Sequence, residues 1–260
     1  MKNLVFAAVA VLAVGLRAGA EIRGETVEYK EGGTVLEGYR VAESEATGSR
    51  PGVLVVHQWM GLTDFEKGRA EALARLGYVV LCADVYGKGV RASNPKEAGT
   101  LAGAYKKDRT LYRKRLTAAL ERLRSDPAVD GTRLAAVGYC FGGTGVLELA
   151  RSGADLRGVV SFHGGLDTPS PSLPGTIRAS VLVLHGGDDP WVPPAQVAAF
   201  EEEMRRAGAD WQVTAYGGAV HAFTDPGAGT DASKGAAYDP RADRRSWEAM
   251  RDFLLEIFGQ

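Results

Sequence analysis

The sequence has 260 residues, of which 45% are hydrophobic and 24% are charged, and its formal net charge is −1. These values are typical of a globular chain that is long enough to bury a substantial core without disulfide or metal staples. They exclude the basic surface that nucleic-acid binding requires, and they exclude a disordered acidic tail.

Residues 1–20 differ from the rest of the chain. Lys2 precedes an apolar run at residues 4–16, and the segment closes with Arg-Ala-Gly-Ala. This pattern is typical of a secretory signal peptide, and the run is shorter than the roughly 20 apolar residues of a membrane-spanning helix. A buried N-terminal helix and an uncleaved membrane anchor are the alternatives. We expect residues 21–260 to be an exported, periplasmic or secreted, monomeric single domain with no stable membrane insertion after cleavage.

The remaining chain is predicted to start with a β-hairpin and to continue with alternating strands and helices. Residues 26–44 alternate apolar and polar side chains around Gly32 and Gly33, as antiparallel hairpins do. Further strands are predicted at 51–58, 78–87, 132–139, 156–164, 180–187 and 211–218. Helices are predicted at 64–77, 107–126, 142–153, 193–208 and 241–259. This order indicates an α/β fold with a mostly parallel sheet, whose ligands bind beyond the carboxyl ends of the strands.

A candidate nucleophile lies between a predicted strand and a predicted helix. Residues 138–142 read Gly-Tyr-Cys-Phe-Gly, the cysteine form of the Gly-x-Ser-x-Gly elbow. Glycines on either side allow two backbones to approach closely, and a helix N-terminus favours a thiolate at Cys140. The N–H of Phe141 would point to a developing oxyanion. Alternatively, Cys140 is a buried packing residue or half of a disulfide with Cys82, which we expect to be buried and inert.

A candidate acid and a candidate base follow Cys140 in the order that α/β-hydrolases use. Asp189 follows a strand and a Gly-Gly turn and precedes Val192-Pro193, while Asp188 is the adjacent competitor that we expect to cap or to be solvated. His221 lies in a glycine-rich loop after the last predicted strand and is the histidine that follows both other groups. The earlier histidines are expected to bond loop backbone near the site (His163, His185) or to line the pocket (His57).

The segments "VVHQWMGL", "ADVYG", "GYCFGG", "GGDDPWVP" and "HAFTDP" together resemble the dienelactone hydrolase family of α/β-hydrolases. The resemblance covers most of residues 21–260 and implies the α/β-hydrolase fold. It implies a Cys140–His221–Asp189 triad that hydrolyses a small carboxylic ester or lactone, of the carboxymethylenebutenolidase class, through an acyl-cysteine intermediate. It also implies an oxyanion hole made by the backbone N–H groups of Phe141 and Trp59. No metal or cofactor motif is present, so we expect none.

Two residues depart from the pattern of the best-known family members. Gln58 stands where those members have a glutamate that takes the thiol proton, and a glutamine amide cannot accept a proton. We therefore expect His221 to ionise Cys140 and Gln58 only to hydrogen-bond near the sulfur. Asp225 stands where those members have a substrate-binding arginine, and its charge would repel an anion.

Aromatic residues at the predicted strand ends indicate an apolar acyl or alkyl site. The expected pocket residues are Gln58, His57, Tyr86 and Trp191, together with Trp59 and Phe141. Two other functions stay open. The protein is either a catalytically degenerate member that binds a ligand or a partner protein, or an enzyme of acyl transfer or peptide cleavage on the same scaffold.

Overall fold

The computed structural model describes residues 21–44 and 47–259. The expected signal peptide, residues 1–20, lies outside the described residues. Within them, no helix is both long enough and apolar enough to cross a membrane.

An eight-stranded sheet forms the centre of the protein, in the order β1-β2-β4-β3-β5-β6-β7-β8. Its strands are β1 (Ile22–Glu31), β2 (Thr34–Glu43), β3 (Arg50–Val56), β4 (Val79–Ala83), β5 (Val129–Tyr139), β6 (Gly158–Phe162), β7 (Ser180–Gly186) and β8 (Trp211–Tyr216). The hairpin β1–β2 joins β4 in antiparallel fashion, and every other pair is parallel. The mostly parallel α/β fold that the sequence predicts is confirmed.

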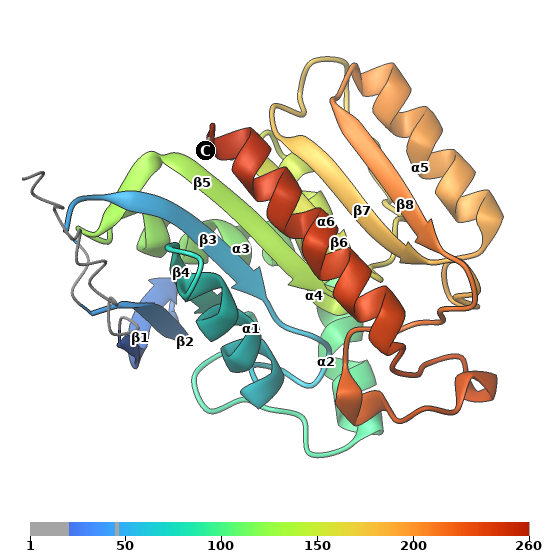
Figure 1. Ribbon diagram of the computed structural model, residues 1–260, viewed down its shortest axis with the longest axis horizontal. Coiled ribbons are helices and arrows are strands. Elements are labelled where there is room, and N and C mark those ends of the chain that lie inside the picture. Colours follow the sequence, from blue (N-terminus) through green and yellow to red (C-terminus); the bar gives the residue numbers. More distant parts are fainter. Residues whose placement is uncertain (1–20, 45–46, 260) are drawn as a thin grey trace, which may run out of the picture.

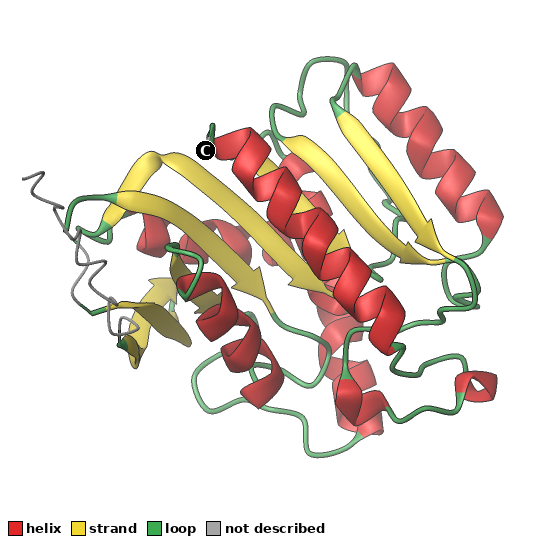
Figure 2. Ribbon diagram, viewed as in Figure 1, coloured by secondary structure: helices red, strands yellow, loops and turns green. Residues whose placement is uncertain are grey.

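Helices cover both faces of the sheet (Figures 1 and 2). One face carries α1 (Asp64–Ala74) and α6 (Pro240–Phe258), and the other carries α2 (Pro95–Lys107), α3 (Arg109–Arg124), α4 (Phe141–Arg151) and α5 (Pro194–Ala207). Because successive side chains of a strand point to opposite faces, β3 supplies both layers. Leu54 and Val56 pack under α3 and α4, whereas Val53 and Val55 pack under α1 and α6.

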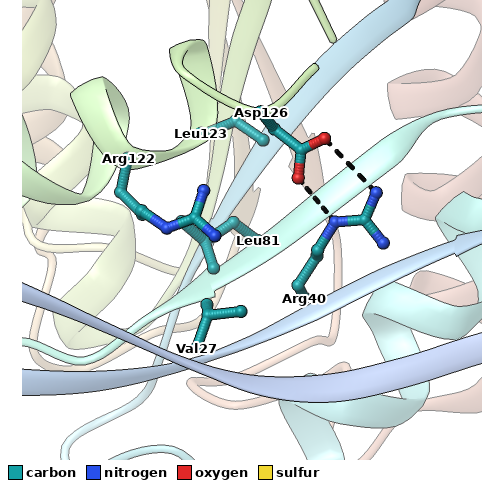
Figure 3. A pocket seen from close by; sticks show the side chains of 6 residues that line it. All are labelled: Val27, Arg40, Leu81, Arg122, Leu123 and Asp126. Carbon is teal, nitrogen blue, oxygen red and sulfur yellow. Dashed lines mark hydrogen bonds and ion pairs between the residues drawn. The ribbon is translucent and has the colours of Figure 1, made fainter. Parts of the chain in front are cut away.

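The hairpin is tied to the helical layer by a partly buried ion pair (Figure 3). Arg40 of β2 donates through Nε and Nη2 to the carboxylate of Asp126, which follows α3, at 2.5 and 3.3 Å. Val27, Leu81 and Leu123 surround the pair, and the space between these side chains is too small to hold a water molecule. This contact is structural, and it lies away from the loops that follow the parallel strands.

Helix α2 is the main element that the sequence-based prediction misses. Its buried side chains are Ala98, Ala102 and Tyr105, so its apolar stripe is small and its helical periodicity is weak. Its start nevertheless carries a recognisable signal, because Asn94 caps the N–H of Glu97 and Pro95 occupies the first turn. The short helices η1 (Pro226–Ala228) and η2 (Ala232–Lys234), which precede α6, are also unpredicted.

Candidate active site

Cys140 occupies the sharp turn between β5 and α4. Its backbone has φ 54° and ψ −112°, a conformation that L-residues rarely adopt and that is common in strained functional turns. The flanking glycines are required sterically. A Cβ on Gly138 would lie 2.1 Å from the carbonyl oxygen of Gly142, and a Cβ on Gly142 would lie 2.1 Å from the carbonyl oxygen of Val56. The structure therefore has the elbow geometry that the Gly-x-Cys-x-Gly spacing predicts.

Three side chains that are far apart in the sequence form one hydrogen-bonded line. His221, in the loop after β8, places Nε2 3.0 Å from Cys140 Sγ and donates from Nδ1 to Asp189 Oδ2 at 2.8 Å. Asp189 follows β7, and its other oxygen accepts the Trp191 backbone N–H at 2.9 Å. The neighbouring Asp188 is exposed, as the sequence predicts. The order acid, imidazole, thiol is the arrangement that activates a nucleophile.

The electrostatics of the line favour a thiolate–imidazolium pair. Burial raises the pKa of the Cys140 thiol, but the positive charge and hydrogen bond of His221 outweigh burial, and the net pKa is lowered. Burial likewise lowers the pKa of His221, but the Cys140 charge and the hydrogen bond to Asp189 outweigh it and raise the pKa to about 10. Each group thus favours the charged form of the other.

This charge state predicts the pH dependence of alkylation. Iodoacetamide reacts with the thiolate, and His221 stays protonated up to about pH 10. We expect the pH profile of Cys140 alkylation to be displaced to lower pH than that of free cysteine in the same buffers, because the pKa of the Cys140 thiol is lowered. The matched variant His221→Ala should return the profile toward that of free cysteine. A wild-type profile that parallels free cysteine would contradict the ion pair.

Cys82, the second cysteine, provides an internal contrast. It is fully buried on β4, is not in a disulfide, and points its sulfur to the carbonyl oxygen of Glu66 at 3.5 Å. Burial raises the pKa of this thiol well above its usual value. Cys82 therefore fits the packing role expected from the sequence, and Cys140 is free to react.

His163 bonds the backbone of Cys140. Its Nδ1 accepts the backbone N–H of Cys140 at 3.1 Å, and its Nε2 donates to the Thr224 hydroxyl at 2.8 Å. Burial holds its pKa well below the usual value, so it stays neutral beside the charged His221, whose ring centroid is 5.2 Å away. The expectation that His163 bonds loop backbone is confirmed. His185 differs, since its buried Nδ1 has no hydrogen-bond partner in the described chain.

The two residues expected to supply the oxyanion hole, Phe141 and Trp59, both line the same cavity as Cys140. Phe141 is the first residue of α4, and its backbone N–H contributes to the lowered pKa of Cys140. Trp59 lies in the loop after β3, and its N–H has no hydrogen-bond partner among the residues that the structure describes. The Tyr86 hydroxyl donates to the carbonyl oxygen of Trp59 at 2.8 Å, which fixes the plane of that part of the loop.

A cavity of about 610 Å³ opens onto Cys140 and His221. Trp59, Met60, Phe141, Trp191 and Val192 give it an apolar, largely aromatic wall. The Trp191 ring packs edge-on against the His221 ring at a centroid distance of 4.8 Å. Another side of the cavity is lined by small residues, which leave room for a ligand (Gly99, Ala102 and Gly103). They belong to α2, the helix that the sequence-based prediction misses.

Two of the expected pocket residues do not line this cavity. His57 is fully buried behind the loop, where Nδ1 donates to the carbonyl oxygen of Gln58 at 2.6 Å and Nε2 accepts the Val85 N–H. Tyr86 is also buried, and it supports the cavity wall from behind through its bond to Trp59 and its ring contact with Phe141 at a centroid distance of 5.6 Å. Both predictions are wrong in placement, because each side chain turns inward at its strand end to satisfy backbone groups that water cannot reach.

Gln58 lines the cavity, but its amide does not bond near the Cys140 sulfur as expected. Its Nε2 donates to Asp225 Oδ2 at 2.8 Å, so the amide serves the carboxylate and not the sulfur. The other Asp225 oxygen accepts the backbone N–H of Gly227. Both of these partners are neutral, and no ion pair joins Asp225 to a cation among the residues that the structure describes. Asp225 thus brings a negative charge to the cavity wall.

Two further charged groups line the cavity. Asp167 pairs with Arg109 at 3.2 Å, which compensates its charge. Lys106, near the end of α2, contributes through its positive charge to the lowered pKa of Cys140. Sequence reasoning missed both residues, because one lies on the unpredicted helix and the other lies in a loop without a motif.

The strained cysteine elbow, the hydrogen-bonded line and the parallel sheet together define an α/β-hydrolase. The model of the dienelactone hydrolase family matches residues 36–258, and the chain belongs to this family. A crystal structure described as a dienelactone hydrolase-like promiscuous phosphotriesterase from metagenomic libraries is 42% identical and superposes with a TM-score of 0.85, covering 92% of this chain and 99% of that one.

Sequence relatives agree with this family. A protein of Bradyrhizobium sp named "Probable 2-oxo-3-(5-oxofuran-2-ylidene)propanoate lactonase" is 30% identical over 231 residues, which span 82% of this chain and 87% of the relative. An uncharacterized protein of Caenorhabditis elegans is 44% identical over 147 residues, which span 55% of this chain and 92% of the relative.

Proposed function

We propose that this protein is a thiol hydrolase of small, uncharged carboxylic esters or lactones. The observation that carries the proposal is the Asp189–His221–Cys140 line, which opens onto an aromatic cavity of about 610 Å³. A cavity of this size suits a small organic ligand, and its apolar wall suits an acyl or alkyl group.

In the proposed reaction the Cys140 thiolate attacks the ester carbonyl carbon and forms an S–C bond. The charge that develops on the carbonyl oxygen is met by the N–H groups of Phe141 and Trp59. The tetrahedral intermediate collapses, the C–O bond to the leaving group breaks, and His221 gives its proton to the departing alkoxide. His221 then takes a proton from water, which cleaves the acyl-cysteine and regenerates the pair. Asp189 holds the imidazole in the tautomer that these transfers need.

Neutral phosphotriesters are a second candidate substrate class. The observation that favours them is the 42% identical relative whose description names promiscuous phosphotriesterase activity. The same thiolate and the same two N–H groups would act on a phosphoryl centre, and a neutral triester carries no charge for Asp225 to repel.

A substrate panel tests the proposed function. The purified chain is assayed with neutral aryl esters, lactones, anionic esters and a neutral aryl phosphotriester, with the Cys140→Ala variant as the blank. We expect Cys140-dependent turnover of the neutral esters or lactones. Absence of turnover across the panel, with tight binding of one of its compounds, would contradict the proposal and favour the ligand-binding alternative. Products formed only with an added alcohol or amine acceptor would favour acyl transfer.

Asp225 is expected to set the charge preference within this panel. For 4-nitrophenyl succinate monoester, which is anionic, Asp225→Asn should raise kcat/KM roughly tenfold, because removing one charge at close range is worth about 1 kcal/mol or more. The neutral 4-nitrophenyl butyrate is the matched control, and its kcat/KM should change little. Steady-state kinetics of both esters measure the ratio. An equal change for both esters would show that Asp225 does not select by charge.

A further inference from the structure

Glu66 is a buried carboxylate that the proposed mechanism does not use. It is the third residue of α1, its side chain is fully buried, and its carboxylate forms no ion pair with a cation of the described chain. Burial raises its pKa, and the hydrogen bonds it accepts only partly offset that effect. A carboxyl group that is buried without an ion pair needs hydrogen-bond donors to stabilise it. The donors to Glu66 therefore show which parts of the chain it contacts.

The donors come from the two ends of the loop between β3 and α1. Glu66 Oε1 accepts the backbone N–H of Gln58 at 2.9 Å. Glu66 Oε2 accepts the backbone N–H of Thr63 at 2.9 Å and its hydroxyl at 2.7 Å. The Thr63 contacts form an ordinary helix-capping box. A capping box does not require the carboxylate to be buried, and it uses only one of the two carboxylate oxygens. The bond to Gln58 is additional, and it reaches eight residues back along the chain to the end of β3.

This loop carries the Trp59 N–H. The Gln58 N–H is held by Glu66, and the Trp59 carbonyl oxygen is held by the Tyr86 hydroxyl at 2.8 Å. The Gly61 N–H closes a turn onto the carbonyl oxygen of Gln58 at 3.2 Å. His57 Nδ1 also donates to that carbonyl oxygen at 2.6 Å. The peptide group between Gln58 and Trp59 is therefore held at its own carbonyl oxygen, and the peptides before and after it are held by Glu66 and Tyr86, while the Trp59 N–H has no partner among the described residues.

We infer that Glu66 is a positioning residue that preorganises the oxyanion hole by clamping the Gln58 N–H, in the peptide immediately before the one that carries the Trp59 N–H. The inference rests on the proposed function, since it needs an oxyanion at the Trp59 N–H. A donor stabilises a transition state only if it already points at the developing charge, because reorienting it during the reaction costs the energy that it would supply. The clamp acts before substrate arrives and touches neither substrate nor sulfur.

The test compares two reactions of Cys140 in Glu66→Gln. The glutamine amide has one acceptor oxygen, which can accept from Gln58 or from Thr63 but not from both, and its NH2 group then faces an N–H donor on the other side. The substitution therefore removes the two-sided hold of the carboxylate. We expect kcat for 4-nitrophenyl acetate to fall by about 10²-fold with KM little changed, as for an interaction made only in the transition state. Alkylation by iodoacetamide forms no oxyanion, and its rate at pH 7 should stay within about twofold of wild type.

Thr63→Val is the matched control. It removes the capping hydroxyl from Glu66 Oε2 and destabilises the helix start, but it leaves both backbone N–H bonds in place. Its kcat should stay within about threefold of wild type even where thermal denaturation shows a lower midpoint. Glu66→Asp is the second variant if Glu66→Gln does not fold, because the shorter carboxylate can still cap α1 but withdraws from Gln58.

Wild-type kcat in the folded Glu66 variants would overturn the inference, and so would alkylation that falls in parallel with turnover. Failure of both variants to fold would assign Glu66 to stability alone and would also overturn it. Turnover that survives Cys140→Ala contradicts the proposed function, whatever the Glu66 variants show. The two failures are therefore distinguishable in one set of assays.

Discussion

Cys140→Ala is expected to lower ester turnover by roughly 10⁴-fold or more, to the level that the oxyanion hole and binding alone support. The alanine removes the atom that His221 Nε2 approaches at 3.0 Å and leaves the elbow backbone and its flanking glycines unchanged. Steady-state kinetics with 4-nitrophenyl acetate measure the loss.

The control for this variant is Cys82→Ala. Cys82 is fully buried in the layer under α1 and α6, so its truncation should lower stability by about 1 kcal/mol through a small cavity. Its turnover should match that of the wild type. Comparable turnover in Cys140→Ala and wild type would place the chemistry on another group and remove the basis for an acyl-cysteine.

Asp189→Asn is expected to lower kcat by roughly 10³- to 10⁴-fold. Asp189 Oδ2 accepts the proton on His221 Nδ1 at 2.8 Å, and an amide can instead donate there and favour the wrong tautomer. Loss of the carboxylate also removes one of the contacts that raise the pKa of His221. Alkylation of Cys140 at neutral pH should therefore slow as well, because its thiolate has a weaker partner.

Asp188→Asn is the control for this variant. The two aspartates are adjacent, but Asp188 is exposed and Asp189 is buried, so the substitution changes the same charge one residue away. Its kcat should match that of the wild type within a factor of two or so. Equal losses in both variants would indicate a general effect of charge and not the orientation of His221.

The sheet and the elbow could be predicted because both depend on patterns that are local in the sequence. Continuous apolar runs identify the parallel strands, and the glycines at 138 and 142 mark the close approach between β5, α4 and β3. Helix α2 could not be found by periodicity, because alanine and glycine make its buried stripe small. The capping pattern at Asn94, Pro95 and Glu97 was the available signal.

The direction of individual side chains was harder to predict than their place along the chain. His57, Gln58 and Tyr86 all lie at strand ends beside the site, as the sequence predicts. His57 and Tyr86 nevertheless turn inward to bond backbone groups, and Gln58 turns to a carboxylate that is 167 residues away. Hydrogen-bond partners of buried polar groups are set by tertiary neighbours, which no local pattern identifies.

The sequence by itself determined the fold class, the position of the cysteine elbow and the order in which Cys140, Asp189 and His221 follow one another, because each depends on residue type and short-range spacing. The tertiary structure alone decided the contacts that lower the pKa of the Cys140 thiol, the neutral partners of Asp225 and the bond from the Gln58 N–H to Glu66. The physical reason is that a pKa and a hydrogen bond depend on burial and on distances of about 3 Å. Such distances exist only after the chain has brought its loops to one edge of the sheet.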